Sequence, residues 1–201
     1  MTDAVLSHPI LTERLILRCW QEADRDPFAA MNADPRVMEY FPSTLDRAAS
    51  DAVVDRLQAH DAAHGFTFWA LEDRATGDFA GFTGLAHVGF AAHFVPVVEI
   101  GWRLPVAYWG RGIASEAARA SLAFGFGRLA LTEIVAFTPN RHLASRRVME
   151  RIGMKRDPAD DFVHPRMPPD HPLQPFVLYR TSRAAWAETP AAEHDSLKEQ
   201  P

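Results

Sequence analysis

The sequence has almost no cysteine and no long apolar segment. Cys19 is the only cysteine among 201 residues, so an intramolecular disulfide is impossible and a reducing compartment, the cytoplasm, is expected. No stretch of about twenty apolar residues is present, so no membrane span is expected. The first nine residues do not combine a charged start with an apolar run, so no signal peptide is expected either.

A dense run of basic residues is also lacking. The formal net charge is −5, from 21 Lys and Arg against 26 Asp and Glu, which disfavours a general nucleic-acid or anionic-membrane binder. The composition, 47% hydrophobic and 23% charged, is that of a soluble globular protein. The length suits one domain, placed at residues 1–188, followed by a polar tail at 189–201 that is expected to be disordered.

A strand, a glycine-containing loop and a helix follow one another in the middle of the chain. The pattern predicts the strand at residues 97–104, the loop at 105–111 and the helix from 112 to about 126. Gly110 and Gly112 let backbone N–H groups face outward without obstruction by a Cβ atom. The positive end of the helix dipole lies at the same point, so the junction predicts a binding site for an anion, most often a phosphate.

Three interpretations of this junction follow from the residues alone. A Walker A loop is rejected because no lysine follows Gly112. A dinucleotide fingerprint would be Gly110-x-Gly112-x-x-Ser115, but residues 105–109 separate it from the strand. The third interpretation is a glycine loop that only turns the chain.

Apolar periodicity and turn residues predict the remaining elements. Strands are expected at residues 15–17, 66–72, 79–88, 131–137 and 176–181. Helices are expected at residues 24–33, from a capping box Ser43-x-x-Asp46 to His64, and at 139–152. The strand at 131–137 follows a helix, so it should run parallel to the strand before that helix. The six prolines in residues 157–175 predict a long irregular loop.

His60 and His64 have the i, i+4 spacing of metal ligands on a helix. Gly65 follows directly, no apolar run flanks the pair, and no third ligand is evident in the sequence. We therefore interpret the pair as a solvated helix end and expect no metal.

Three segments carry a resemblance to the GNAT superfamily of N-acetyltransferases. Trp109-Gly110-Arg111-Gly112-Ile113-Ala114 resembles its acyl-CoA loop in five of six positions, with Trp109 where Gln or Arg is usual. Thr12-Glu13-Arg14-Leu15-Ile16-Leu17-Arg18 with Asp24 resembles the opening of the ribosomal-protein N-terminal acetyltransferase (RimJ/RimL-type) branch. The segment from Asn140 through Ser145 to Gly153 is similar to the family's later helix, although His142, not Asn140, lies three residues before the serine.

The resemblance implies an α+β fold with a mixed, mostly antiparallel sheet flanked by helices. Two strands, at 97–104 and 131–137, would splay apart into a cleft for acetyl-CoA, and Gly101 could permit the bulge that parts them. Acetyl-CoA is then the expected co-substrate. The residues implied to bind it are Trp102, Arg103, Leu104, Trp109, Gly110, Arg111, Gly112, Ile113, Ala114, Ser115 and Asn140, with His142 as the alternative to Asn140.

Two residues are candidates for the chemistry. Glu99 lies within a mostly apolar strand, where burial would raise its pKa and suit it to act as a base; the alternative is a glutamate on an exposed strand face. Ser145 could hydrogen-bond or protonate the leaving thiolate; the alternative is a hydroxyl at a helix start.

The predicted function is acetyl-CoA-dependent acetylation of a primary amine, on a protein N-terminus or on a small molecule. The alternatives are a non-catalytic acyl-CoA-binding module and a nicotinamide-dependent oxidoreductase. The expected partners are acetyl-CoA and the amine acceptor, with neither nucleic acid nor membrane. The oligomeric state is left open, a homodimer included.

Overall fold

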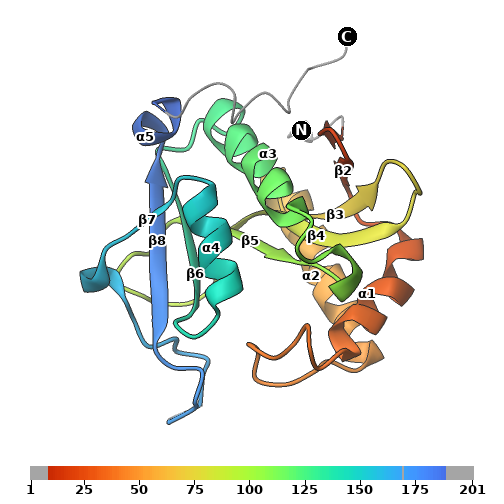
Figure 1. Ribbon diagram of the computed structural model, residues 1–201, viewed down its shortest axis with the longest axis horizontal. Helices are drawn as coiled ribbons and strands as arrows, with labels where there is room; N and C mark the ends of the chain where they lie inside the picture. Colours follow the sequence, from red (N-terminus) through yellow and green to blue (C-terminus); the bar gives the residue numbers. More distant parts are fainter. Residues whose placement is uncertain (1–8, 169, 189–201) are drawn as a thin grey trace.

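The computed structural model describes residues 9–168 and 170–188, in which one mixed sheet runs through the whole fold (Figure 1). The strand order is β1-β2-β3-β4-β5-β6-β8-β7, and β5 with β6 is the parallel pair, as predicted from the helix between them. The strands are β1 Ile10–Leu11, β2 Leu15–Arg18, β3 Phe68–Asp73, β4 Phe79–His87, β5 Val98–Arg103, β6 Glu133–Pro139, β7 Lys155–Arg156 and β8 Phe176–Ser182.

Five α-helices and three short 3-10 turns accompany the described strands. Figure 1 shows α3 and α4 in front of the sheet and α2 behind it. The α-helices are α1 Arg25–Ala33, α2 Arg47–His64, α3 Ile113–Gly127, α4 Leu143–Arg151 and α5 Arg183–Ala187, and the 3-10 turns are η1 Glu22–Asp24, η2 Val106–Tyr108 and η3 Pro158–Asp160. No helix in the described ranges is long and apolar enough to cross a membrane.

The two faces of the sheet bury different cores, because alternate strand residues point to opposite sides. The face under α3 and α4 buries Leu85, Ile100, Ile134 and Met149. The opposite face packs an aromatic group of Trp20, Phe28 and Phe82 under α1 and α2.

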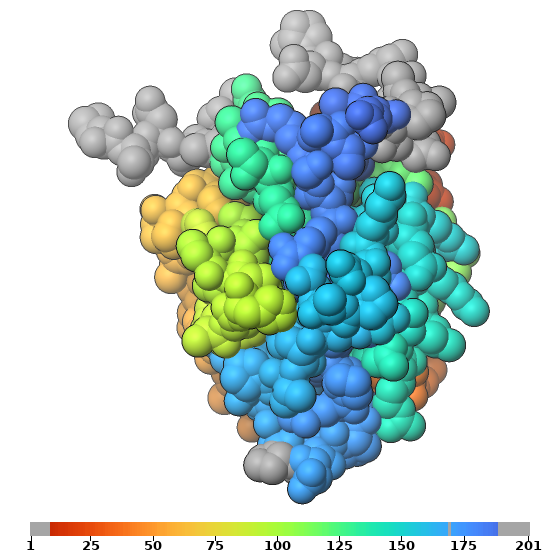
Figure 2. Space-filling view, turned by 90° about the vertical axis from the view of Figure 1, so that its left-hand side faces the viewer, coloured from red at the N-terminus to blue at the C-terminus, as the bar shows by residue number. Residues whose placement is uncertain are grey.

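The second face continues over the C-terminal strands, where two long connections meet. Figure 2 shows residues 88–97 in yellow-green against the light-blue segment that follows β7. Phe90 stacks on Phe162 with ring centroids 6.1 Å apart, and the Arg166 guanidinium donates to the Gly89 carbonyl. The proline-rich stretch thus forms a cover over the sheet, and the structure adds η3 and an isolated bridge between Phe162 and Phe176 to the predicted irregular loop.

The predicted end of α2 at His64 is confirmed, and glycines mark two other points where the chain bends or strands approach closely. Gly65 ends α2 in the left-handed conformation (φ 76°), and Gly77 takes φ 76° in the hairpin between β3 and β4. Gly81 lies beside a register shift between β3 and β4, and a Cβ atom built on it would come within 2.3 Å of the Arg103 carbonyl oxygen. Gly81 therefore lies at an irregularity of the β3–β4 pairing, where the backbone of β5 comes close to it.

Three local expectations were wrong. Asp46, not Ser43, caps α2, since its carboxylate accepts from the Ala49 N–H at 2.8 Å. The helix expected from residue 139 begins at Leu143, because Pro139 is the last residue of β6 and His142 is the N-cap. The expected bulge at Gly101 is absent from the described β4–β5 pairing, which runs in unbroken register. Gly101 instead leaves room for the Phe68 ring, which a Cβ would meet at 3.1 Å. The tail at 189–201 lies outside the described residues.

Candidate active site

The site forms where the parallel strands β5 and β6 part. One residue pair, Glu99 with Val135, is in register between them, and both strands then continue along a cavity of about 870 Å³. The cavity is bounded by β5, the end of β6, the loop between α1 and α2, the glycine loop and α4. Of the predicted residues, Glu99, Trp102, Arg103, Leu104, Trp109, Gly110, Gly112, Ile113, Ala114, Ser115, His142 and Ser145 line it.

The glycine loop has the backbone that the sequence predicts. Gly110 and Gly112 have φ values of +71° and +78°, a region that side chains with a Cβ rarely adopt. Gly112 is the N-cap of α3, so the first N–H groups of that helix have no partner within the helix. Because Gly112 to Ser115 line the cavity, one end of it is suited to an anion.

The N-terminal hairpin holds this loop in place. Arg14 donates from Nη1 to the Arg111 carbonyl at 2.8 Å and from Nε to Glu116 at 2.6 Å. Glu116, in the first turn of α3, also accepts from the Thr12 hydroxyl at 2.6 Å. These contacts fasten the glycine loop and the first turn of α3 to the segment around Thr12 and Arg14. Sequence reasoning missed this role, since the partners lie about a hundred positions apart.

The side chains of Trp109 and Arg111 make contacts within the loop. The Trp109 indole N–H donates to the Leu104 carbonyl at 2.9 Å and closes the turn, while 47% of the residue stays exposed. Arg111 does not line the cavity: its carbonyl accepts from Arg14 and its guanidinium lies over the Tyr108 ring at 5.1 Å.

Glu99 lies on β5 at the last point where β5 and β6 pair. Burial raises the pKa of its carboxyl to about 8, while the positive charge of Arg166 acts in the opposite direction. No side chain in residues 9–168 and 170–188 donates a hydrogen bond to this carboxylate. A lone carboxyl that titrates near neutral pH in a cavity is suited to accept a proton.

The start of α4 forms the wall opposite Glu99's strand. Ser145 is 8% exposed and lines the cavity, as does Met149 one turn later. His142 stacks on Tyr40 with centroids 4.0 Å apart, and burial lowers its pKa to about 4, so it is neutral at physiological pH. The Asn140 amide oxygen instead accepts from Arg146 at 2.9 Å, and Asn140 does not line the cavity.

Arg103 is a cavity residue whose side chain sequence reasoning did not consider. Its Nη1 donates to the Asn32 amide oxygen at 2.6 Å, and its guanidinium lies over the Phe41 ring at 4.0 Å. Its Nε is buried without a hydrogen-bond partner, and within the described part of the chain no carboxylate forms an ion pair with it. Burial lowers its pKa to about 10, which leaves it cationic at neutral pH.

Comparison with known proteins agrees with this geometry. Residues 14–155 match the acetyltransferase (GNAT) domain family. The chain is 34% identical to Bacillus subtilis YkkB over 146 residues, which cover 72% of this chain and 84% of YkkB. It is 31% identical to the B. subtilis N-acetyltransferase YnaD over 150 residues, 74% of this chain and 83% of YnaD.

Solved structures share the fold. A GNAT-family acetyltransferase from Bacillus anthracis superimposes with a TM-score of 0.71 at 25% identity, over 88% of this chain and 99% of that one. Mycobacterium smegmatis RimJ, solved in complex with CoA-disulfide, superimposes with a TM-score of 0.70 at 18% identity, over 93% and 90% of the two chains.

Proposed function

This chain belongs to the GNAT family of acetyltransferases, and we propose that it transfers the acetyl group of acetyl-CoA directly to a primary amine, on a protein N-terminus or on a small molecule. One observation carries the proposal. A lone carboxyl with a raised pKa, Glu99, lines the same cavity as an anion-binding glycine loop. A base and a phosphate-binding end in one cavity are what such a transfer requires.

The binding end has groups suited to the phosphates and the pantetheine arm. The N–H groups at the start of α3, from Gly112 to Ser115, are available to the pyrophosphate. Past Glu99, none of the described strands pairs with the edge of β5 that faces β6, so backbone groups near Trp102 and Leu104 are available to the pantetheine amides. One such N–H would polarise the thioester carbonyl, where negative charge develops.

The transfer needs a base and a donor for the leaving group. The amine nitrogen forms a bond to the carbonyl carbon while the carbon–sulfur bond breaks, and the electron pair leaves with sulfur. Glu99 accepts the proton that the amine loses, directly or through water. The Ser145 hydroxyl hydrogen-bonds the departing thiolate, which is finally protonated to the thiol of CoA.

Arg103 supports one class of acceptor. Glu99 and Arg103 are four residues apart on β5, so their side chains project from the same face about 13 Å apart. A buried cation that has no acidic partner in the described part of the chain favours an anionic group there. We therefore propose an acceptor that carries a carboxylate or phosphate beyond its amine.

The test is a transfer assay with the purified chain. We expect release of the CoA thiol with at least one member of a panel of peptides and small amines, and mass spectrometry should show an added acetyl group on that amine. Glu99→Gln is the matched variant. Binding of acetyl-CoA without thiol release across the panel would favour the acyl-CoA-binding module, and binding of NADH without CoA would favour the oxidoreductase; either outcome overturns the proposal.

A further inference from the structure

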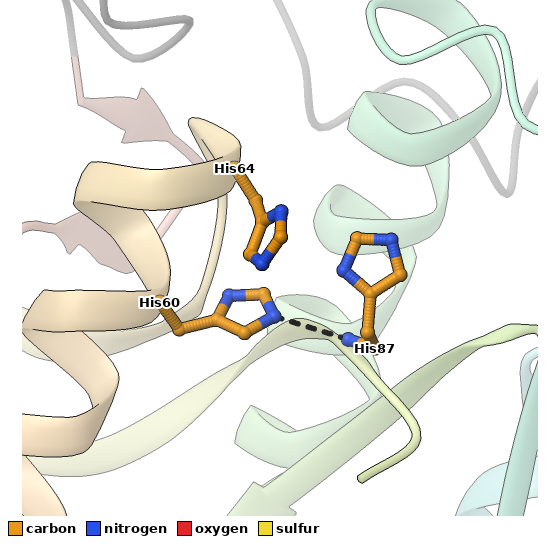
Figure 3. Close-up of side chains that lie close together, drawn as sticks. All are labelled: His60, His64 and His87. Carbon is orange, nitrogen blue, oxygen red and sulfur yellow. Dashed lines mark hydrogen bonds between the residues drawn. The ribbon is translucent and has the colours of Figure 1, made fainter.

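Three histidines converge on the surface at the end of α2 (Figure 3). His60 and His64 lie one turn apart near the end of that helix, and His87 is the last residue of β4. One ligand nitrogen from each lies within 4.8 Å of the others. None of the three lines the cavity of the candidate active site, so this cluster is separate from it.

The cluster changes the interpretation of the i, i+4 histidine pair. A solvated helix end was favoured because the sequence showed no third ligand. The fold supplies that ligand, because β4 ends beside α2 and places the His87 ring 4.6 Å from the His64 ring and 5.5 Å from the His60 ring, between centroids.

The tautomer of His60 is set by its surroundings. Its Nδ1 lies 2.8 Å from the Phe66 carbonyl oxygen, which can only accept, so Nδ1 carries the hydrogen. The lone pair is therefore on Nε2, which accepts weakly from the His87 backbone N–H at 3.2 Å. An imidazole held by a carbonyl through its other nitrogen is the usual arrangement of a metal-ligating histidine.

The cluster is open to solvent. His64 and His87 are exposed, so their rings can rotate and water can reach the centre of the cluster.

We propose that His60, His64 and His87 bind one divalent transition-metal ion, Zn²⁺ foremost, with water in the remaining position. Three imidazoles suit zinc, copper, nickel or cobalt, whereas Mg²⁺ and Ca²⁺ require oxygen ligands. A tetrahedral ion with bonds of 2.0–2.1 Å needs ligand nitrogens about 3.3 Å apart, so the three rings must move closer together on binding. His60 Nε2 must also give up its hydrogen bond from the His87 backbone N–H to bind the metal. The bound ion would tie the end of α2 to the end of β4.

The experiment measures binding of zinc chloride to the metal-free full chain by calorimetry, with Co²⁺ absorption as a probe of tetrahedral coordination. We expect one ion per chain. Removing a residue that only hydrogen-bonds a metal ligand typically weakens metal binding about 10–100-fold. His64→Ala and His87→Ala each remove a ligand itself, so we expect zinc affinity to fall by at least that factor. His93→Ala is the matched control: an exposed histidine outside the cluster, 3.5 Å from Asp160, whose loss should leave the affinity unchanged.

A second readout is independent of affinity. Zinc should raise the melting temperature of the wild-type chain and of His93→Ala, because an ion that binds only the folded state stabilises it. It should not raise that of His64→Ala or His87→Ala, whose metal-free melting temperatures check that they are folded. Equal zinc binding by the wild type and the His64→Ala/His87→Ala double variant would overturn the proposal, as would a wild type that binds no zinc.

Discussion

Burial raises the pKa of the Glu99 carboxyl and the positive charge of Arg166 lowers it. Burial has the larger effect, and the pKa is about 8. The ionised form is the base, so kcat/KM should rise with pH to a plateau above about 8. We predict that Glu99→Gln lowers turnover near pH 7.5 by about a hundredfold, the usual contribution of a positioned base. Acetyl-CoA affinity should change little. The deficit should shrink at high pH, where the free amine needs no base; wild-type turnover near neutrality would remove Glu99 from the chemistry.

Ser145 is predicted to act at the leaving group. Ser145→Ala should lower kcat more than it weakens acetyl-CoA binding, because the hydroxyl matters most as the thiolate forms. The matched control is Ser121→Ala: another buried helical serine, it donates to the Ala117 carbonyl at 3.0 Å and does not line the cavity. Steady-state kinetics measures kcat and calorimetry measures acetyl-CoA affinity for both variants. An unchanged kcat in Ser145→Ala would mean that Ser145 is only a hydroxyl at the start of a helix.

Arg103 is predicted to select the acceptor. Arg103→Met keeps an apolar stem beside Phe41 but removes the charge, so KM should rise at least about tenfold for acceptors with an anionic group and change little for neutral amines. Arg103→Lys should recover part of the difference. If KM rises equally for anionic and neutral acceptors, Arg103 does not select the acceptor and only supports the loop that carries Phe41.

At the scale of elements, the glycine loop depends on contacts with the β1–β2 hairpin at the edge of the sheet. The first turn of α3 is joined to the β1–β2 hairpin through Glu116, which accepts from Thr12 and Arg14, and Arg14 also holds the loop carbonyl of Arg111. The loop is therefore fixed from outside, by the Arg14 contact to its carbonyl and by the contacts of Glu116 in the first turn of α3.

Two glycines with nearly equal φ values allow a matched test of this loop. Gly112 and Gly77 have φ values of +78° and +76°, and a Cβ on Gly77 would meet nothing within 4 Å. Replacing either by glutamate should cost about 1–2 kcal/mol of stability through left-handed strain. Gly112→Glu should in addition abolish acetyl-CoA binding, because a carboxylate enters the anion site. Calorimetry that finds equal affinity in the two variants would remove the loop from the site.

For the whole molecule, the burial of Glu99 links stability to pH. Its pKa is higher in the folded chain than the ordinary value near 4.5, so the unfolded chain releases this proton first as the pH rises. Stability from this group is intact below about pH 4.5, falls as pH rises, and is lost above about pH 8. At about 1.4 kcal/mol per pKa unit, the penalty reaches a few kcal/mol.

The same variant tests this linkage. Glu99→Gln cannot ionise, so it should be more stable than the wild type at pH 9 and similar to it at pH 5. Urea unfolding of both proteins at the two pH values measures the difference, in which the other titrating groups cancel. A stability difference that does not change between pH 5 and pH 9 would contradict the raised pKa.

Local sequence was sufficient for most elements and for the family. The glycine loop, the strand before it and the helix after it were predicted from residues next to one another, and the family match over residues 14–155 confirms the GNAT resemblance. Ribosomal-protein acetyltransferases occur among the structural neighbours, while the relatives with the higher sequence identity are Bacillus proteins such as YkkB and YnaD. Turn chemistry and periodicity act over a few residues, so these features can be read along the chain. The predicted starts of α2 and α4 were three or four residues too early. In each case two capping or turn residues lie close together, and the later one precedes the helix.

The tertiary structure alone decided the environment of each group. It buries Glu99 where β5 and β6 part and, among residues 9–168 and 170–188, gives Arg103 no acidic partner. It also places Arg14 against Glu116 across 102 positions and brings His87 to His60 across 27. A pKa, an unpaired charge or a third ligand depends on which distant segments meet, and that is set by the crossing of strands and helices. The sequence by itself determined which chemical groups the chain carries and the local backbone of the loop. Folding determined which of those groups share a cavity, because burial and charge pairing are properties of the assembled sheet.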